Sequence, residues 1–286
     1  MKAEAAPPYP LEGVVSWNMN TTCNYRCSYC TQRFVDDRKQ WARDLPAFIQ
    51  FFCDLPGDWE VKLSGGEPTL HPGFEELVGA LSAAGRRVSM VTNLSARPAL
   101  LASFSALTAA RPGIISASLH LEYADVDAFL AKLSAVAAAH AGPVHATCVA
   151  TRAALPGLPD LVARFAAAGL QLKVQPEKQD RDVIDYTDDE LDALRALGGH
   201  NGTGRIRAHF RGQPCWAGAR YFIVDHRGEA YRCYPARRGK TERLGNVLDG
   251  TARLGLGPRP CAYDYCSCTV PQERGMVMGG RCSQGA

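Results

Sequence analysis

Residues 13–30, GVVSWNMNTTCNYRCSYC, join a short apolar run to three closely spaced cysteines. The run Val14–Asn18 predicts a β-strand, because it is short, contains β-branched residues and alternates apolar with polar side chains. Cys23, Cys27 and Cys30 follow in the spacing C-x3-C-x2-C, in the loop that leaves this strand. In parallel α/β barrels such loops carry the chemistry, and three thiolates can ligate three irons of an iron–sulfur cluster.

The sequence from residue 13 to about residue 176 alternates strand-like and helix-like runs, which is typical of repeated βα units around a parallel sheet. The six predicted strands are Val14–Asn18, Glu60–Ser64, Arg87–Asn93, Gly113–His120, Val144–Thr151 and Leu170–Gln175. The predicted helices between them are Leu45–Leu55, Phe74–Ala84, Pro98–Leu107, Asp125–His140 and Leu158–Ala168. The fold class that we expect is α/β.

A parallel sheet that is covered on both faces requires strands that are apolar on both faces. These strands are not. Since side chains alternate across a strand, one face is polar, with Ser16, Asn18, Glu60, Lys62, Ser64, Ser116, Ser118, His120, Gln171, Lys173 and Gln175. The pattern favours a partial (β/α)6 TIM-like barrel whose lumen holds a ligand. An edge-exposed sheet is the alternative.

The 286 residues carry a formal net charge of +3, which is too small to indicate a nucleic-acid partner. No apolar run approaches the roughly 18 residues of a membrane span, and residues 1–12 show no secretory signal. We therefore expect a cytoplasmic protein without a membrane partner. In that reducing compartment, eleven cysteines point to metal or cluster ligands more than to disulfides.

The composition of the chain changes after Pro176. An acidic segment, a predicted helix near Asp188–Leu197 and a glycine-rich link follow. A hairpin of Tyr221–Asp225 with Ala230–Tyr234 is predicted beyond the link. We expect an N-terminal extension at residues 1–12, a barrel core at 13–198 and a small cysteine-rich domain at 199–286.

The cysteine loop resembles the C-x3-C-x2-C signature of the radical S-adenosylmethionine (radical SAM) superfamily, including an aromatic residue, Tyr29, before the last cysteine. A second match stands at the end of the second strand, where Ser64-Gly65-Gly66-Glu67-Pro68 resembles the family's GGEP motif. A zinc knuckle is the alternative, but it needs a fourth ligand nearby, and the first histidine is His71.

The resemblance implies that Cys23, Cys27 and Cys30 hold a four-iron four-sulfur cluster that cleaves SAM reductively to a 5′-deoxyadenosyl radical. It implies that Tyr29, Gly65, Gly66, Glu67, Asn93 and Ser118 contact SAM. Leu94 stands where the family often has glycine, and the strand Val144–Thr151 shows no clear glycine-isoleucine-glycine motif. Inward-facing His120, Lys173 and Gln175 are candidate substrate contacts.

Cys215 and Cys233, in the spacing C-x12-G-x4-C, resemble the start of the SPASM and Twitch extensions of radical SAM enzymes, which hold auxiliary clusters. Cys261, Cys266 and Cys268 would supply the remaining ligands, and the single-cluster Twitch type fits better. A four-cysteine zinc ribbon is the alternative. Cys282 is expected to be a free thiol, and Cys53 and Cys148 small core residues.

The resemblance implies an oxidoreductase or epimerase of a biosynthetic pathway that abstracts hydrogen from a small polar molecule. A maturase of a ribosomally synthesised peptide is the second hypothesis, which the short segment before the first strand disfavours. A non-catalytic metal-binding module is the third. For the reductant, the cations Arg237, Arg238 and Lys240 suggest a docking face for an acidic donor such as flavodoxin, with a solvated surface as the simpler interpretation.

Overall fold

The structure is a computed structural model that describes residues 13–32, 34–179, 182–197, 210–264, 270 and 276–277. Its centre is a sheet of six parallel strands in chain order. They are β1 (Gly13–Asn20), β2 (Trp59–Gly65), β3 (Arg87–Thr92), β4 (Pro112–Leu119), β5 (Val144–Ala150) and β6 (Leu172–Pro176). The predicted strands are thus confirmed to within about two residues at each end.

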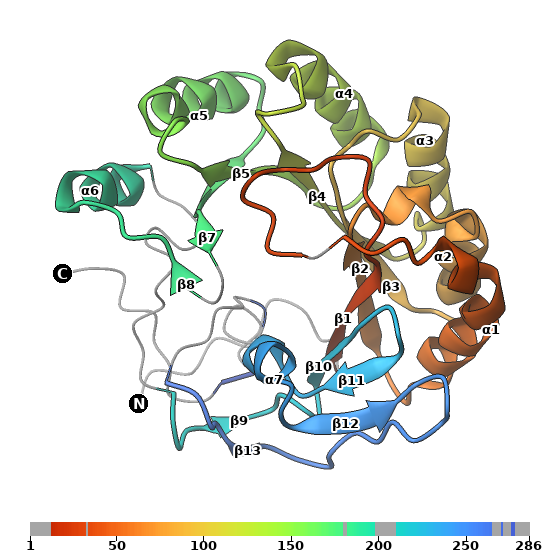
Figure 1. Ribbon diagram of the computed structural model, residues 1–286. Helices are drawn as coiled ribbons and strands as arrows, with labels where there is room; N and C mark the ends of the chain where they lie inside the picture. The colour runs from red at the N-terminus through yellow and green to blue at the C-terminus, as the bar shows by residue number, and fades with distance from the viewer. Residues whose placement is uncertain are drawn as a thin grey trace, which may run out of the picture.

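Helices cover the outer side of this curved sheet (Figure 1). They are α1 (Arg38–Asp54), α2 (Phe74–Ala83), α3 (Pro98–Leu107), α4 (Val126–Ala139) and α5 (Leu158–Ala167), with the 3-10 turns η1 (Pro68–Leu70) and η2 (Leu155–Gly157). Figure 1 shows them as an arc around the strands, so the chain forms the expected partial barrel. None of the described helices is long and apolar enough to cross a membrane.

The outer sides of the strands pack on the helices in one large apolar core. Trp17 of β1 illustrates the contact, since its ring lies 4.6 Å from that of Phe48 and 5.0 Å from that of Phe52, both on α1. Burial of such aromatic side chains is the main favourable term in folding. The core therefore lies between sheet and helices and leaves the inner face of the sheet to polar side chains.

Helix α1 begins at Arg38, so the predicted start at Leu45 is wrong. Pro46 lies inside the helix. The earlier turns form because Trp41 is buried and stacks on His71 at 4.8 Å, and no local pattern reveals this long-range contact.

The last quarter of the chain extends the same sheet. Strand β10 pairs in parallel with β1, and β11 and β12 follow in antiparallel order, so the sheet has nine strands. The predicted hairpin is confirmed as the β10–β11 pair, but its second strand ends at Tyr231, and Tyr234, predicted as its last residue, begins a helix. The remaining elements are β7 (Lys178–Gln179), β8 (Asp182–Val183), α6 (Asp188–Ala196), β9 (Pro214–Cys215), β10 (Tyr221–Val224), β11 (Glu229–Tyr231), α7 (Tyr234–Gly239), β12 (Arg243–Asn246) and β13 (Arg259–Pro260). The predicted domain boundary near residue 199 lies outside the described residues.

Candidate active site

A cavity of about 640 Å³ lies on the inner side of the sheet, within the size range of small-molecule sites. Its lining includes Cys23, Cys27, Tyr29, Cys30, Ser64, Gly65, Gly66, Asn93, Ser118, His120, Lys173 and Gln175. The structure therefore brings together, on one cavity, almost all of the residues that the sequence assigns to SAM and substrate. Glu67 is not among the lining residues.

The loop after β1 presents its three thiols to this cavity, each with a hydrogen-bond partner. Cys23 Sγ donates to Asn24 Oδ1 at 3.9 Å, and Cys30 Sγ donates to the Gln32 carbonyl at 3.7 Å. Cys27 Sγ lies 3.3 Å from His120 Nδ1. Burial raises the pKa of Cys23, and it raises the pKa of Cys27 to about 11, so bound iron would have to supply the positive charge that turns these thiols into thiolates.

The end of β4 holds the cysteine loop in place. The Glu122 carboxylate accepts from the backbone N–H of Ser28 at 2.9 Å and also from its hydroxyl. The Tyr123 ring stacks on Tyr25 at 4.6 Å, and its Oη accepts from the backbone N–H of Arg26 at 3.0 Å. We did not assign roles to Glu122 and Tyr123 from the sequence, because both lie beyond the predicted strand and belong to no motif.

Tyr29 and His120 meet at the cavity wall. Tyr29 Oη lies 2.9 Å from His120 Nδ1, and the two rings are stacked. Burial raises the pKa of Tyr29 and lowers the pKa of His120. The loop and the end of β4 thus share a polar contact directly beside Cys27.

The Gly65-Gly66 pair lets the end of β2 approach the cysteine loop closely. The backbone N–H of Gly66 donates to the Asn20 carbonyl at 2.8 Å, and that of Glu67 donates to the Thr22 carbonyl at 2.9 Å. A Cβ on Gly66 would lie 2.1 Å from the Thr22 oxygen. Gly65 has φ +144°, a region that side chains other than glycine rarely adopt.

The Glu67 side chain is completely buried and joins the ends of β2 and β3. Its Oε1 accepts from Thr69 N at 3.2 Å, Thr69 Oγ1 at 2.6 Å and Thr92 Oγ1 at 2.8 Å. Its Oε2 accepts from the backbone N–H of Asn93 at 2.6 Å. Burial raises the pKa of Glu67, and these hydrogen bonds oppose the shift. The carboxylate therefore fixes Asn93, whose Nδ2 donates to Asn24 Oδ1 in the cysteine loop at 2.8 Å.

The donor set fits an iron–sulfur cluster. Three thiols from one loop face one cavity, which is the arrangement of a cluster bound by three cysteines. Among the described residues, no group of three or more His, Cys, Asp or Glu side chains is arranged to hold a metal ion. Binding of a cluster would replace the present hydrogen bonds of the three thiols by bonds to iron.

The C-terminal cysteines Cys215 and Cys233 belong to a second, smaller apolar cluster, and the partly buried Cys261 packs against it. Burial raises the pKa of Cys215, with a contribution from neighbouring Cys261, and raises that of Cys233 to about 12. Strand β13 pairs with β9 next to Cys215, which brings the Cys261 segment alongside. Cys266, Cys268 and Cys282 lie outside the described residues.

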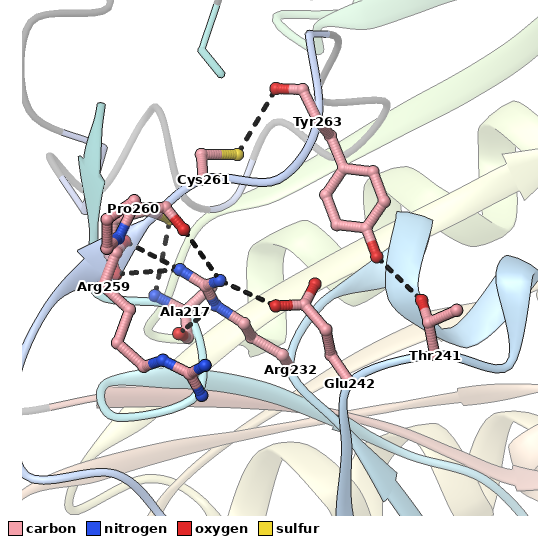
Figure 2. Close-up of polar contacts among 9 residues, drawn as sticks. Ala217, Arg232, Thr241, Glu242, Arg259, Pro260, Cys261 and Tyr263 are labelled. Carbon is pink, nitrogen blue, oxygen red and sulfur yellow. Dashed lines mark hydrogen bonds and ion pairs between the residues drawn. The ribbon is translucent and has the colours of Figure 1, made fainter. Parts of the chain in front are cut away.

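Arg232, of which 3% is exposed, connects the segments that carry these three cysteines (Figure 2). It directly precedes Cys233, and its guanidinium forms an ion pair with Glu242 at 2.8 Å. The same guanidinium donates at 2.8 to 3.4 Å to the carbonyl oxygens of Cys215, Ala217, Arg259 and Pro260. We missed Arg232 from the sequence, since an arginine within a basic segment carries no signal of burial.

The three cations that we assigned to a docking face point in different directions. Arg238 lines the cavity. Arg237 donates at 3.1 Å to the Asn18 side-chain oxygen. In this orientation of the amide, the Asn18 nitrogen donates to Ser64 Oγ. Lys240 is exposed at the end of α7. Two of the three thus face the barrel.

Comparisons with known proteins agree with this site. Residues 17–125 match the model of the Radical SAM superfamily. The chain is 32% identical over 82 residues to the GTP 3′,8-cyclase of Stenotrophomonas maltophilia (strain R551-3), which is 27% of this chain and 25% of that protein. It is 31% identical over 71 residues to an S-adenosylmethionine-dependent nucleotide dehydratase of Thermoplasmatales archaeon (strain ISO4-H5). These residues are 25% of this chain and 25% of that protein. The match thus spans about a quarter of the length of these curated relatives.

A solved structure supports the fold over a longer stretch. SuiB of Streptococcus suis, bound to its precursor peptide SuiA, matches with a TM-score of 0.57 at 14% identity, over 84% of this chain and 64% of that one. Another SuiB structure contains S-adenosylmethionine. The cysteine loop, the Gly65-Gly66 turn, the end of β1 and strands β2 to β4 all lie within the region that matches the family model. Residues 17–125 form a domain of the radical SAM superfamily.

Proposed function

We propose that this protein cleaves SAM reductively and uses the resulting carbon radical to remove a hydrogen atom from a small polar molecule, in a dehydrogenation or an epimerisation. The observation that carries the proposal is the single cavity shared by the three thiols, the ends of β2 and β3, and the polar side chains of β4 to β6. Family membership implies the cluster and SAM, and the polar wall supports a polar substrate.

The residues of the chain have distinct parts in this proposal. Cys23, Cys27 and Cys30 would hold the cluster, and Gly65 and Gly66 leave backbone exposed to the amino-acid part of SAM. Glu67 acts as a positioning residue through Asn93. When bound, SAM and the reduced cluster would supply the radical, which the residues around the cavity must shield from water and unwanted partners.

We extend the proposal to a second four-iron four-sulfur cluster. Cys215 and Cys233 share one apolar cluster, against which Cys261 packs, and Cys266 or Cys268 would complete four ligands. A cluster held by these cysteines would supply an acceptor for the electron left after hydrogen abstraction, which would favour dehydrogenation.

A peptide substrate is the second candidate function. The observation in its favour is the fold likeness to SuiB, which is bound to a precursor peptide. The polar lining of the cavity and its volume favour a small molecule.

Anaerobic reconstitution tests the main proposal. With dithionite and SAM, the wild-type protein is expected to form 5′-deoxyadenosine, measured by mass spectrometry, and the Cys27→Ala variant is expected to form none. Cys53→Ala is the matched control, because Cys53 lies on α1 and donates to the Ala80 carbonyl, away from the cavity. A folded, iron-loaded wild-type protein that leaves SAM intact would contradict the proposal.

A further inference from the structure

The cavity wall carries several cations outside the cysteine loop. Lys62 of β2, Lys173 of β6, Lys178 of β7 and Arg238 of α7 all line it. Among the described lining residues, the single carboxylate is that of Glu60. It is 1% exposed and accepts from Ser89 Oγ at 2.7 Å.

Strand register places Lys62 below the Gly65-Gly66 turn and Lys173 level with Ser118. Lys62 lies two residues before Ser64, which at about 3.3 Å per residue is roughly 7 Å deeper in the barrel. Lys62 pairs with Ser16 across the β1–β2 ladder. Lys173 pairs with Thr147, which pairs in turn with Ser118. Each lysine therefore stands beside hydroxyl groups that also line the cavity.

Several cations in a concave wall focus a positive potential and attract anions. Ammonium and guanidinium groups donate charge-assisted hydrogen bonds to carboxylate and phosphate oxygens, and these are about twice as strong as neutral ones. The serine and threonine hydroxyls offer additional donors to the same oxygens. The cysteine loop lines the same cavity, so a molecule held by these cations would lie within reach of the radical site.

We infer that the substrate is an anion whose carboxylate or phosphate group is bound by Lys62, Lys173 and Arg238. The inference deepens the proposed function, because it names the class of molecule that the radical site acts on. It also assigns Arg238 to the substrate and not to a docking face for an electron donor.

The test measures binding of two probes, inorganic pyrophosphate and tricarballylate, to the reconstituted protein by calorimetry in the presence of excess SAM. Saturable binding of pyrophosphate indicates a phosphate site, and saturable binding of tricarballylate a carboxylate site. Lys62→Gln and Lys173→Gln are expected to weaken binding about tenfold each. Lys62→Arg, which keeps the charge, is expected to retain most of the affinity.

Lys39→Gln is the matched control, because Lys39 lies exposed on α1 and outside the cavity. Absence of saturable binding, or equal weakening by Lys39→Gln, overturns the inference. If the wild-type protein forms 5′-deoxyadenosine but binds neither probe, the anion site is contradicted and the proposed function stands. If the protein binds a probe through Lys62 and Lys173 but never cleaves SAM, the anion site stands and the proposed function is contradicted.

Discussion

Arg232 and Glu242 form an ion pair at 2.8 Å in which 4% of the arginine side chain is exposed. Because four backbone carbonyls also accept from this guanidinium, its charge and its shape both hold the C-terminal segments together. Removing one partner of a buried pair leaves the other charge uncompensated.

Arg232→Gln is therefore expected to lower the free energy of unfolding by about 3 kcal/mol, measured by urea denaturation of the iron-free protein. Arg243→Gln is the control, since Arg243 pairs with Glu229 in a half-exposed ion pair on the next strand, and such pairs contribute about 1 kcal/mol or less. Equal losses in the two variants would show that Arg232 does not connect the three segments.

Gly66→Ala is expected to abolish detectable SAM cleavage and to lower the melting temperature. The new Cβ would lie 2.1 Å from the Thr22 carbonyl oxygen, so the turn and the cysteine loop must move apart. Gly157→Ala is the control, because no atom lies within 4 Å of its added Cβ. Normal 5′-deoxyadenosine formation by Gly66→Ala would show that the close approach of the two segments is dispensable.

His71 is expected to make stability depend on pH. Burial lowers its pKa to about 4, and the charge of Asp37 opposes the shift. Between that value and the ordinary pKa of about 6.5, the unfolded chain binds a proton that the folded protein does not. The free energy of unfolding therefore falls as the pH decreases through this window, by up to about 1.4 kcal/mol per pH unit.

The measurement compares the wild-type protein with His71→Gln in urea denaturation between pH 7 and pH 4.5. The variant is expected to show the shallower slope, since it lacks the titrating ring that stacks on Trp41. An unchanged slope would assign the effect to other groups.

Cys233→Ala is expected to separate the two proposed clusters. The wild-type protein should bind about eight irons and the variant about four, as two four-iron clusters require. The variant should still form 5′-deoxyadenosine with dithionite, because Cys233 does not line the cavity. Stoichiometric zinc together with about four irons in the wild-type protein would show that the C-terminal cysteines bind zinc and not a second cluster.

Lys240→Glu tests the electron donor. If flavodoxin docks at the end of α7, charge reversal at this exposed residue slows flavodoxin-driven SAM cleavage, most strongly at low ionic strength. Cleavage driven by dithionite should remain at the wild-type rate. Equal effects on both electron sources would contradict docking at Lys240.

The sequence predicted what depends on local pattern. Strand periodicity placed Ser118, Lys173 and Gln175 on the inner face, and the cavity confirms this arrangement. Helix α1 was misjudged because its first turns depend on the Trp41–His71 contact. The Glu67 carboxylate could not be placed, since two of its four hydrogen bonds come from the end of the next strand, at Thr92 and Asn93.

The pairing of β10 with β1 has a consequence for biosynthesis. Ser16 and Tyr221 lie on neighbouring strands but 205 residues apart in the sequence. While the ribosome is still making the middle of the chain, one edge of β1 has no partner strand, and open strand edges recruit other chains. Contacts between such distant segments form late and slowly. The nascent barrel would therefore remain open to aggregation until its last quarter emerges, and a chain cut near residue 200 would retain that exposed edge permanently.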